Sequence, residues 1–107
     1  MPSSGPSPAS SVLAQPIQVG RIQLSHRIVM APMTRFRASK EHIVNEAAAE
    51  YYSQRATPAG TLLITEGILI APKAGGLAHA PGIWNDEQIA AWKKVRLTND
   101  CQQPVPR

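Results

Sequence analysis

Two short apolar runs separated by a helix-forming segment constrain the fold of this chain more than any other feature. The first run is "IVMA", residues 28–31, and the second begins "TLLITEG", residues 61–67. Short apolar runs bounded by turn residues are typical of strands buried on both faces, as parallel strands are. Between them, "EAAAEYYSQRA" is rich in helix formers, and Pro58 and Gly60 follow it. The order strand, helix, strand predicts a βαβ unit of a parallel sheet.

Further elements are predicted on both sides of this unit. The stretch "PIQVGRIQLSHR", residues 16–27, alternates apolar and polar residues around Gly20, which predicts a short β-hairpin. A long loop over 67–83 leads to a second helix, "NDEQIAAWKKV", residues 85–95. The resulting class is α/β, and the element order is that of the opening of an α/β barrel or a doubly wound sheet.

The two helices carry start signals and an apolar face. Asn45 is expected to cap the first helix, and Asn85 and Gln88 have the spacing of a capping box at the start of the second. Ile89 and Trp92 lie three positions apart, so we expect them to face inward together.

Composition excludes several classes of function. The 107 residues suffice for one small domain, and the net charge of +4 comes from basic residues spread along the chain, so we expect no nucleic-acid partner. No apolar run approaches the roughly 20 residues of a membrane span, so we expect no membrane contact. The single cysteine, Cys101, excludes an internal disulfide, and the N-terminus lacks the features of a secretory signal. We therefore expect a cytoplasmic protein.

The chain divides into three expected segments. Residues 1–14 are rich in Ser and Pro and are expected to be a disordered leader. Residues 15–95 carry all the predicted elements. Residues 96–107 show no apolar strand and no helical stripe and contain two prolines, so we expect an aberrant, disordered tail.

Residues 15–95 resemble the N-terminal part of the old yellow enzyme family, the FMN-dependent NADPH dehydrogenases and ene-reductases, and especially its fungal branch with ergot-alkaloid pathway members. The motifs that carry the resemblance are "PIQVGRIQLSHRIVMAPMTRFRA", "EYYSQRATPAGTLLITEG" and "APKAGGLAHAPGIWNDEQIAAWKKV". The resemblance implies the N-terminal portion of a (β/α)8 TIM barrel, with about two βα units after the hairpin, and thus an incomplete barrel. It also implies FMN as the cofactor and NADPH as the reductant of the intact relatives.

The resemblance assigns cofactor-binding positions to Pro32, Met33, Thr34 and Gly67, which follow the two strands at the mouth where FMN lies. In relatives the threonine hydroxyl donates to the flavin C4 carbonyl oxygen, which gives Thr34 a role in stabilising charge that arrives on reduction. Gly67 has no Cβ and so allows the backbone to approach the ring. The residues alone favour a simpler interpretation, in which Thr34 is a β-branched residue that ends a strand and Gly67 is a turn residue.

Three other features bear on the site. Glu66 and Arg35 both lie near strand ends and are expected to form an ion pair that packs the barrel mouth. Many relatives have a tyrosine after "AGG" that lines the substrate pocket, whereas this chain has Leu77. The three histidines have no regular metal-ligand spacing and no cysteine partners, so no metal site is expected.

The later segments of the family supply the substrate-binding pair, the proton donor and the FMN phosphate site, and none of these can be located in this chain. We therefore assign no catalytic residue and expect a truncated family member that is inactive alone. The alternative is an interaction module or a pseudogene product with no redox role, whose open sheet edges pair with another chain.

Overall fold

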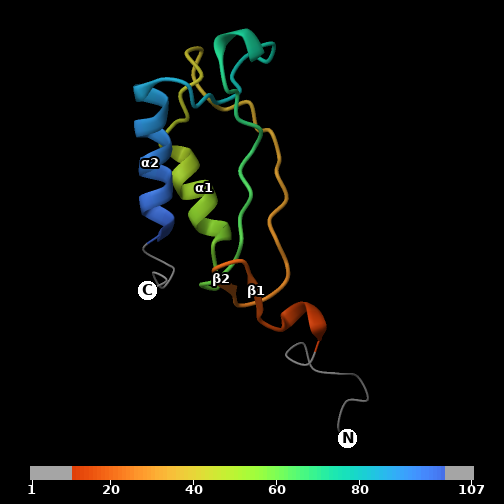
Figure 1. The fold of residues 1–107 in the computed structure, drawn as a ribbon. Coiled ribbons are helices and arrows are strands. Elements are labelled where there is room, and N and C mark those ends of the chain that lie inside the picture. Colours follow the sequence, from red (N-terminus) through yellow and green to blue (C-terminus); the bar gives the residue numbers. More distant parts are fainter. Residues whose placement is uncertain (1–10, 101–107) are drawn as a thin grey trace, which may run out of the picture.

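A computed structural model describes residues 11–100 of the chain (Figure 1). In chain order, its elements are the 3-10 helix η2 (Val12–Ala14), the strands β1 (Ile17–Val19) and β2 (Ile22–Leu24), the helix α1 (Ala47–Arg55), the 3-10 helix η3 (Pro72–Ala74) and the helix α2 (Asp86–Asp100). The helix η2 falls within the expected leader and is capped by Ser11, whose hydroxyl accepts from the amide of Leu13. Residues 1–10 of that leader lie outside the described residues.

The predicted hairpin is confirmed. Strands β1 and β2 pair antiparallel, with Ile17 opposite Leu24 and Val19 opposite Ile22. Gly20, at the first position of the connecting turn, has a φ of 59°, a left-handed conformation that glycine adopts without steric cost.

The two apolar runs lie side by side as parallel extended segments, as the βαβ pattern predicts (Figure 1). Met30 bridges Leu63: its amide donates to the carbonyl of Leu62 at 3.1 Å, and its carbonyl accepts from the amide of Ile64 at 3.1 Å. A second parallel bridge, Leu69 to Gly82, lies within the stretch expected to be a long loop. The parallel register of the unit is therefore present, although the pairing is confined to isolated bridges.

Burial of these segments on both faces was a wrong expectation. Met30 and Leu63 pack against the core, whereas their chain neighbours Val29 and Ile64 are 37% and 46% exposed. Side chains alternate between the two faces of an extended segment, and among the described residues the helices cover only one of those faces. The opposite face is the one that the interior of a closed barrel would bury.

The core forms where helices α1 and α2 pack together on one side of the paired segments (Figure 1). Its buried members are Val44, Tyr52 and Val95, and Trp92 packs against them. Glu46 directly precedes α1 but has helical φ and ψ and makes no side-chain cap. Asn45, one position earlier, caps this turn as predicted, because its Oδ1 accepts from the amide of Ala48 at 3.2 Å.

The capping box of α2 is also confirmed. The side-chain oxygen of Asn85 accepts from the amide of Gln88 at 2.9 Å, and Oε1 of Gln88 accepts from the amide of Asn85 at 3.3 Å. Of the two residues of α2 predicted to face inward, Trp92 does pack against the core, but Ile89 is 48% exposed. Gln88 is instead fully buried, because its amide also donates to the carbonyl of Glu41 at 3.1 Å and so ties α2 to an earlier loop.

Helix α2 extends to Asp100, beyond the end at Val95 that the sequence indicated. The apolar stripe stops there, but no glycine or proline interrupts residues 96–100, so the backbone hydrogen bonds of the helix continue. Residues 101–107 of the expected tail lie outside the described residues.

Candidate functional site

The four residues assigned from the sequence lie at the carboxyl ends of the paired segments. Pro32, Met33, Thr34 and Gly67 are all exposed. A Cβ built on Gly67 would lie 3.9 Å from the hydroxyl oxygen of Thr34. The parallel pairing of Met30 with Leu63 sets this register, because it brings the residues that follow each bridge to the same edge. Thr34 and Gly67 are therefore neighbours in space.

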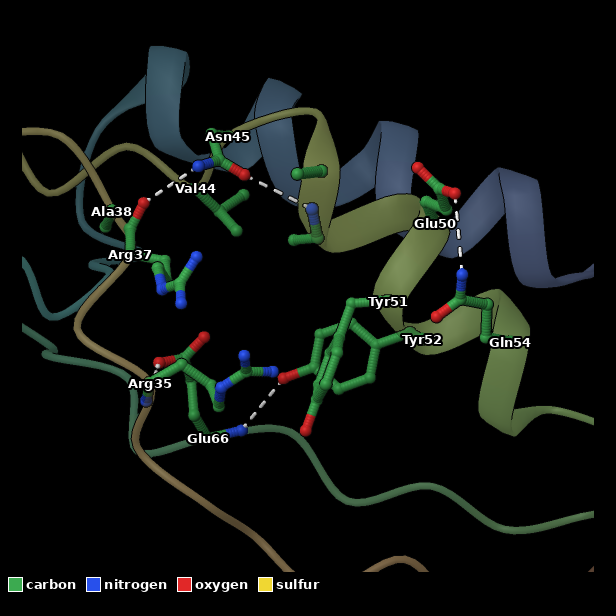
Figure 2. A pocket seen from close by; sticks show the side chains of 12 residues that line it. Arg35, Arg37, Ala38, Val44, Asn45, Glu50, Tyr51, Tyr52, Gln54 and Glu66 are labelled. Carbon is green, nitrogen blue, oxygen red and sulfur yellow. Dashed lines mark hydrogen bonds between the residues drawn. The ribbon is translucent and has the colours of Figure 1, made fainter.

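Glu66 fastens the two segment ends to each other and to helix α1. Its carboxylate accepts from the backbone amide of Arg35 at 3.1 Å, and its own amide donates to the hydroxyl oxygen of Tyr52 at 3.2 Å (Figure 2). Both side chains are buried, and burial is the main cause that raises the pKa of the Tyr52 phenol above its ordinary value. These contacts fix the backbone next to Thr34 and Gly67.

The expected ion pair between Glu66 and Arg35 takes a different form. The contact is made by the backbone of Arg35, and its guanidinium lies over the ring of Tyr51, 4.1 Å from the ring centroid. The guanidinium of Arg55 lies 3.9 Å from the same centroid. Stacking on an aromatic face suits the planar, weakly hydrated guanidinium, and no pattern in the sequence indicated this arrangement.

A cavity of about 310 Å³ lies between the segment ends and helix α1 (Figure 2). Its lining consists of Arg35, Arg37, Ala38, Val44, Asn45, Ala47, Ala48, Glu50, Tyr51, Tyr52, Gln54 and Glu66. Two guanidinium groups and two carboxylates line it, so its formal charge is balanced. Its lining includes Arg35 and Glu66, the chain neighbours of Thr34 and Gly67.

Two histidines join the loops that follow the paired segments. The ring Nδ1 of His42 lies 2.7 Å from the carbonyl oxygen of Ala80, and Nδ1 of His79 lies 2.8 Å from that of Ala38. The ring of His42 also packs against Trp84, with centroids 5.4 Å apart. Sequence reasoning considered the histidines only as metal ligands and missed this role, because the pairing depends on the approach of two distant loops.

The described part of the chain offers little for other kinds of site. No group of three or more His, Cys, Asp or Glu side chains within residues 11–100 is placed to bind a metal ion. Neither helix in that range has the length and hydropathy that a membrane crossing requires.

Comparison with protein families decides the relationship of the chain. The model of the NADH:flavin oxidoreductase / NADH oxidase family matches residues 12–103. The chain belongs to this family. The match includes residues beyond Val95, so the family pattern continues into the segment that the sequence analysis expected to be aberrant.

Among curated relatives, a chanoclavine-I aldehyde reductase of Penicillium roqueforti is 58% identical over 83 residues, which are 78% of this chain and 22% of the relative. A probable inactive dehydrogenase of Claviceps fusiformis is 51% identical over 87 residues, 81% of this chain and 23% of the relative. The chain thus spans under a quarter of the length of these two relatives.

Solved structures give the same relationship. The old yellow enzyme of Pichia sp. AKU4542 superposes with a TM-score of 0.84 at 40% identity, over 88% of this chain and 24% of the enzyme. The old yellow enzyme homologue of Zymomonas mobilis superposes with a TM-score of 0.80 at 39% identity, over 86% of this chain and 25% of the homologue. The fold is therefore part of an old yellow enzyme TIM barrel, and FMN and NADPH are the cofactor and reductant of intact relatives.

Proposed function

We propose that this chain is the flavin-facing N-terminal part of a reductase barrel. Its intact relatives would reduce activated alkenes or aldehydes, in fungal secondary metabolism, with NADPH as the reductant. The observation that supports this proposal best is the juxtaposition of Thr34 and Gly67 at the exposed ends of two parallel segments. We place the protein in the cytoplasm as part of the same proposal.

The residues at this edge fit the flat ring of FMN. A ring needs an open surface without protruding side chains, and Gly67 has none, while the adjacent hydroxyl of Thr34 is a donor. Pro32 and Met33 extend the same exposed backbone. When bound, FMN would supply hydride transfer from the reductant to the substrate.

Thr34 would tune that chemistry by its position. Its hydroxyl is held on backbone that Glu66 fixes through the amide of Arg35, so it would not need to reorient as charge arrives on the ring. Gly67 would let its own backbone come close to the ring. We assign no proton donor and no metal ligand to this chain.

The chain alone would be inactive. It covers 22% of the length of the relative from Penicillium roqueforti, and one face of its paired segments is exposed and apolar. The same exposed face favours a second candidate function, an interaction module without a redox role that pairs its open edges with another chain.

Flavin binding and NADPH oxidation by the purified chain test these proposals. We expect neither tight FMN binding nor turnover from the chain alone. Addition of a separately produced polypeptide that spans the rest of a family barrel is expected to restore bound, yellow FMN. Turnover by the chain alone would refute the proposal that it is inactive alone, and a complemented complex that binds no flavin would favour the interaction module.

A further inference from the structure

A second hollow, which we call the rim hollow, lies between the loops that follow the two paired segments. It has a volume of about 300 Å³ and is lined by Lys40, His42, Gly75, Gly76, Leu77, Ala78 and His79. Both loops leave the carboxyl ends of the parallel segments, which is the edge where Thr34 and Gly67 lie. In barrels of this kind, ligands enter at that end.

The two histidines of the rim hollow are fixed in one tautomer. A carbonyl oxygen only accepts, so Nδ1 of His42 donates to Ala80, and Nδ1 of His79 donates to Ala38. Each ring therefore has Nε2 left for a ligand. Nε2 of His42 lies 4.0 Å from the position of a Cβ built on Gly75, another lining residue, so this end of the ring faces the hollow.

The backbone holds both rings in place as well. His42 has a φ of 61° and His79 a φ of 62°, a left-handed conformation that is uncommon outside glycine. Such a conformation persists where the surroundings determine it, and it is frequent in binding sites. Here the carbonyl of His79 accepts from Ala38 at 3.0 Å, and that of His42 accepts from Gly82 at 2.8 Å. The two imidazoles are thus positioned before any ligand arrives.

The charge of the rim hollow suits an anion. Lys40 is the one fully charged residue of the lining, and the carboxylate of Glu41, which interacts with Lys40 and His42, is exposed and lies outside the lining. Gly75 and Gly76 have no side chains, so a ligand can come close to their backbone. A phosphate monoester has its second pKa at about 6, so one phosphate oxygen can carry a proton and donate it to an imidazole Nε2.

We propose that the rim hollow binds the terminal phosphate of the reductant, the 2′-phosphate monoester of NADPH. This inference rests on the proposed function. That phosphate lies on the adenosine half of the molecule, remote from the nicotinamide, so it can reach a rim while the nicotinamide lies over the flavin. Lys40 supplies the charge, and Nε2 of His42 and of His79 are the acceptors for a protonated phosphate oxygen.

Histidine NMR signals of the full chain test the proposal during titration with inorganic phosphate, NADP+, NAD+ and FMN. We expect inorganic phosphate and NADP+ to shift the ring signals of His42 and His79 saturably. NAD+ has no phosphate monoester and should cause less than about a third of that shift. His26 is the internal reference, because its ring is engaged by the amide of Ile28 and the hydroxyl of Thr61.

Three outcomes would overturn the proposal. No saturable shift with inorganic phosphate excludes an anion site, and equal shifts at all three histidines indicate non-specific binding. Shifts with FMN but not with NADP+ would assign the phosphate to the flavin instead of the reductant. The titration observes histidines only, so it gives a result whether or not the chain binds flavin, and failure of the proposed function is recognised separately.

Variants separate binding from folding. In H42N and H79N, asparagine tolerates the left-handed backbone and keeps a donor near the position of Nδ1, while Nε2 is removed. We expect each variant to keep the fold and to weaken phosphate binding about threefold to fivefold, and Lys40→Ala to do the same. Lys93→Ala, on the exposed side of α2, is the matched control and should bind phosphate like the unaltered chain. Unchanged affinity in H42N, H79N and Lys40→Ala would contradict the proposal.

Discussion

Leu63 and Ile64 are adjacent in the chain, yet they lie on opposite faces of the same extended segment. Leu63 packs with Met30 against the helices, whereas Ile64 is 46% exposed. The two residues have nearly the same size and hydropathy, so intrinsic preference does not separate them. The difference shows that helices α1 and α2 supply an apolar cover for one face, and that the other face needs a cover from elsewhere.

The largest loss of stability is expected when the central aromatic residue of the covered face is removed. Tyr52→Ala is expected to lower the free energy of unfolding by about 4 kcal/mol, because it empties the buried site between α1, α2 and the paired segments. Tyr52→Phe removes only the hydroxyl that accepts from Glu66, and is expected to cost about 1 kcal/mol. Urea unfolding measures both, and equal losses would show that the hydroxyl, and not the packing, is decisive.

Substitution of Leu63 and of Ile64 tests the difference between the two faces directly. Leu63→Ala is expected to cost about 2 kcal/mol, because the side chain is partly buried against the core. Ile64→Ala should change stability by less than about 0.5 kcal/mol, since its side chain is exposed. The same substitution at Ile64 should reduce self-association in sedimentation experiments. A larger loss at Ile64 than at Leu63 would contradict the assignment of the two faces.

Alkaline pH should weaken the covered face by a smaller amount. Burial raises the pKa of Tyr52 above the ordinary value of 10.0, so the folded chain binds this proton more tightly than the unfolded chain. That contribution is fully present below pH 10 and is lost as the pH rises through the folded pKa. Urea unfolding between pH 8 and 11 should show the decline, and Tyr52→Phe should reduce its slope. An identical slope in the two proteins would refute the assignment.

The smallest effect on stability is expected at the edge where the two faces meet. Thr34→Ala should change the free energy of unfolding by less than about 0.5 kcal/mol, because the residue is exposed. In the complemented complex, the same change should lower the reduction potential of bound FMN, whereas Thr34→Ser should restore it. Spectroelectrochemical titration measures the potential. An unchanged potential would leave Thr34 with a purely structural role.

Local patterns in the sequence predicted a large part of this fold. The alternation around Gly20 and the capping residues Asn45 and Asn85 act over a few positions, and each was confirmed. The parallel order of the two apolar runs was also correct, because a helix between two strands restricts the connection. The motifs of the chain were enough to identify its family, which the match over residues 12–103 bears out.

Local sequence patterns did not predict the contacts between segments that are distant in the chain. The burial of Gln88 depends on the carbonyl of Glu41, and the guanidinium of Arg35 found the ring of Tyr51 where an ion pair had been expected. The roles of His42 and His79 likewise depend on two loops that meet only in the folded chain. When a side chain has several possible partners, the tertiary structure decides which of them it contacts, because it brings only some of them close.

The sequence by itself determined the hairpin, the starts of the two α-helices, the order of the paired segments and the family, because caps, turns and apolar periodicity are short-range properties of the chain. Only the tertiary structure decided which face of the paired segments is covered and that Thr34 lies beside Gly67. The physical reason is that burial and proximity depend on where distant segments pack. An apolar run predicts that its side chains will be buried, but only the packing of the helices decides which face of the run is buried.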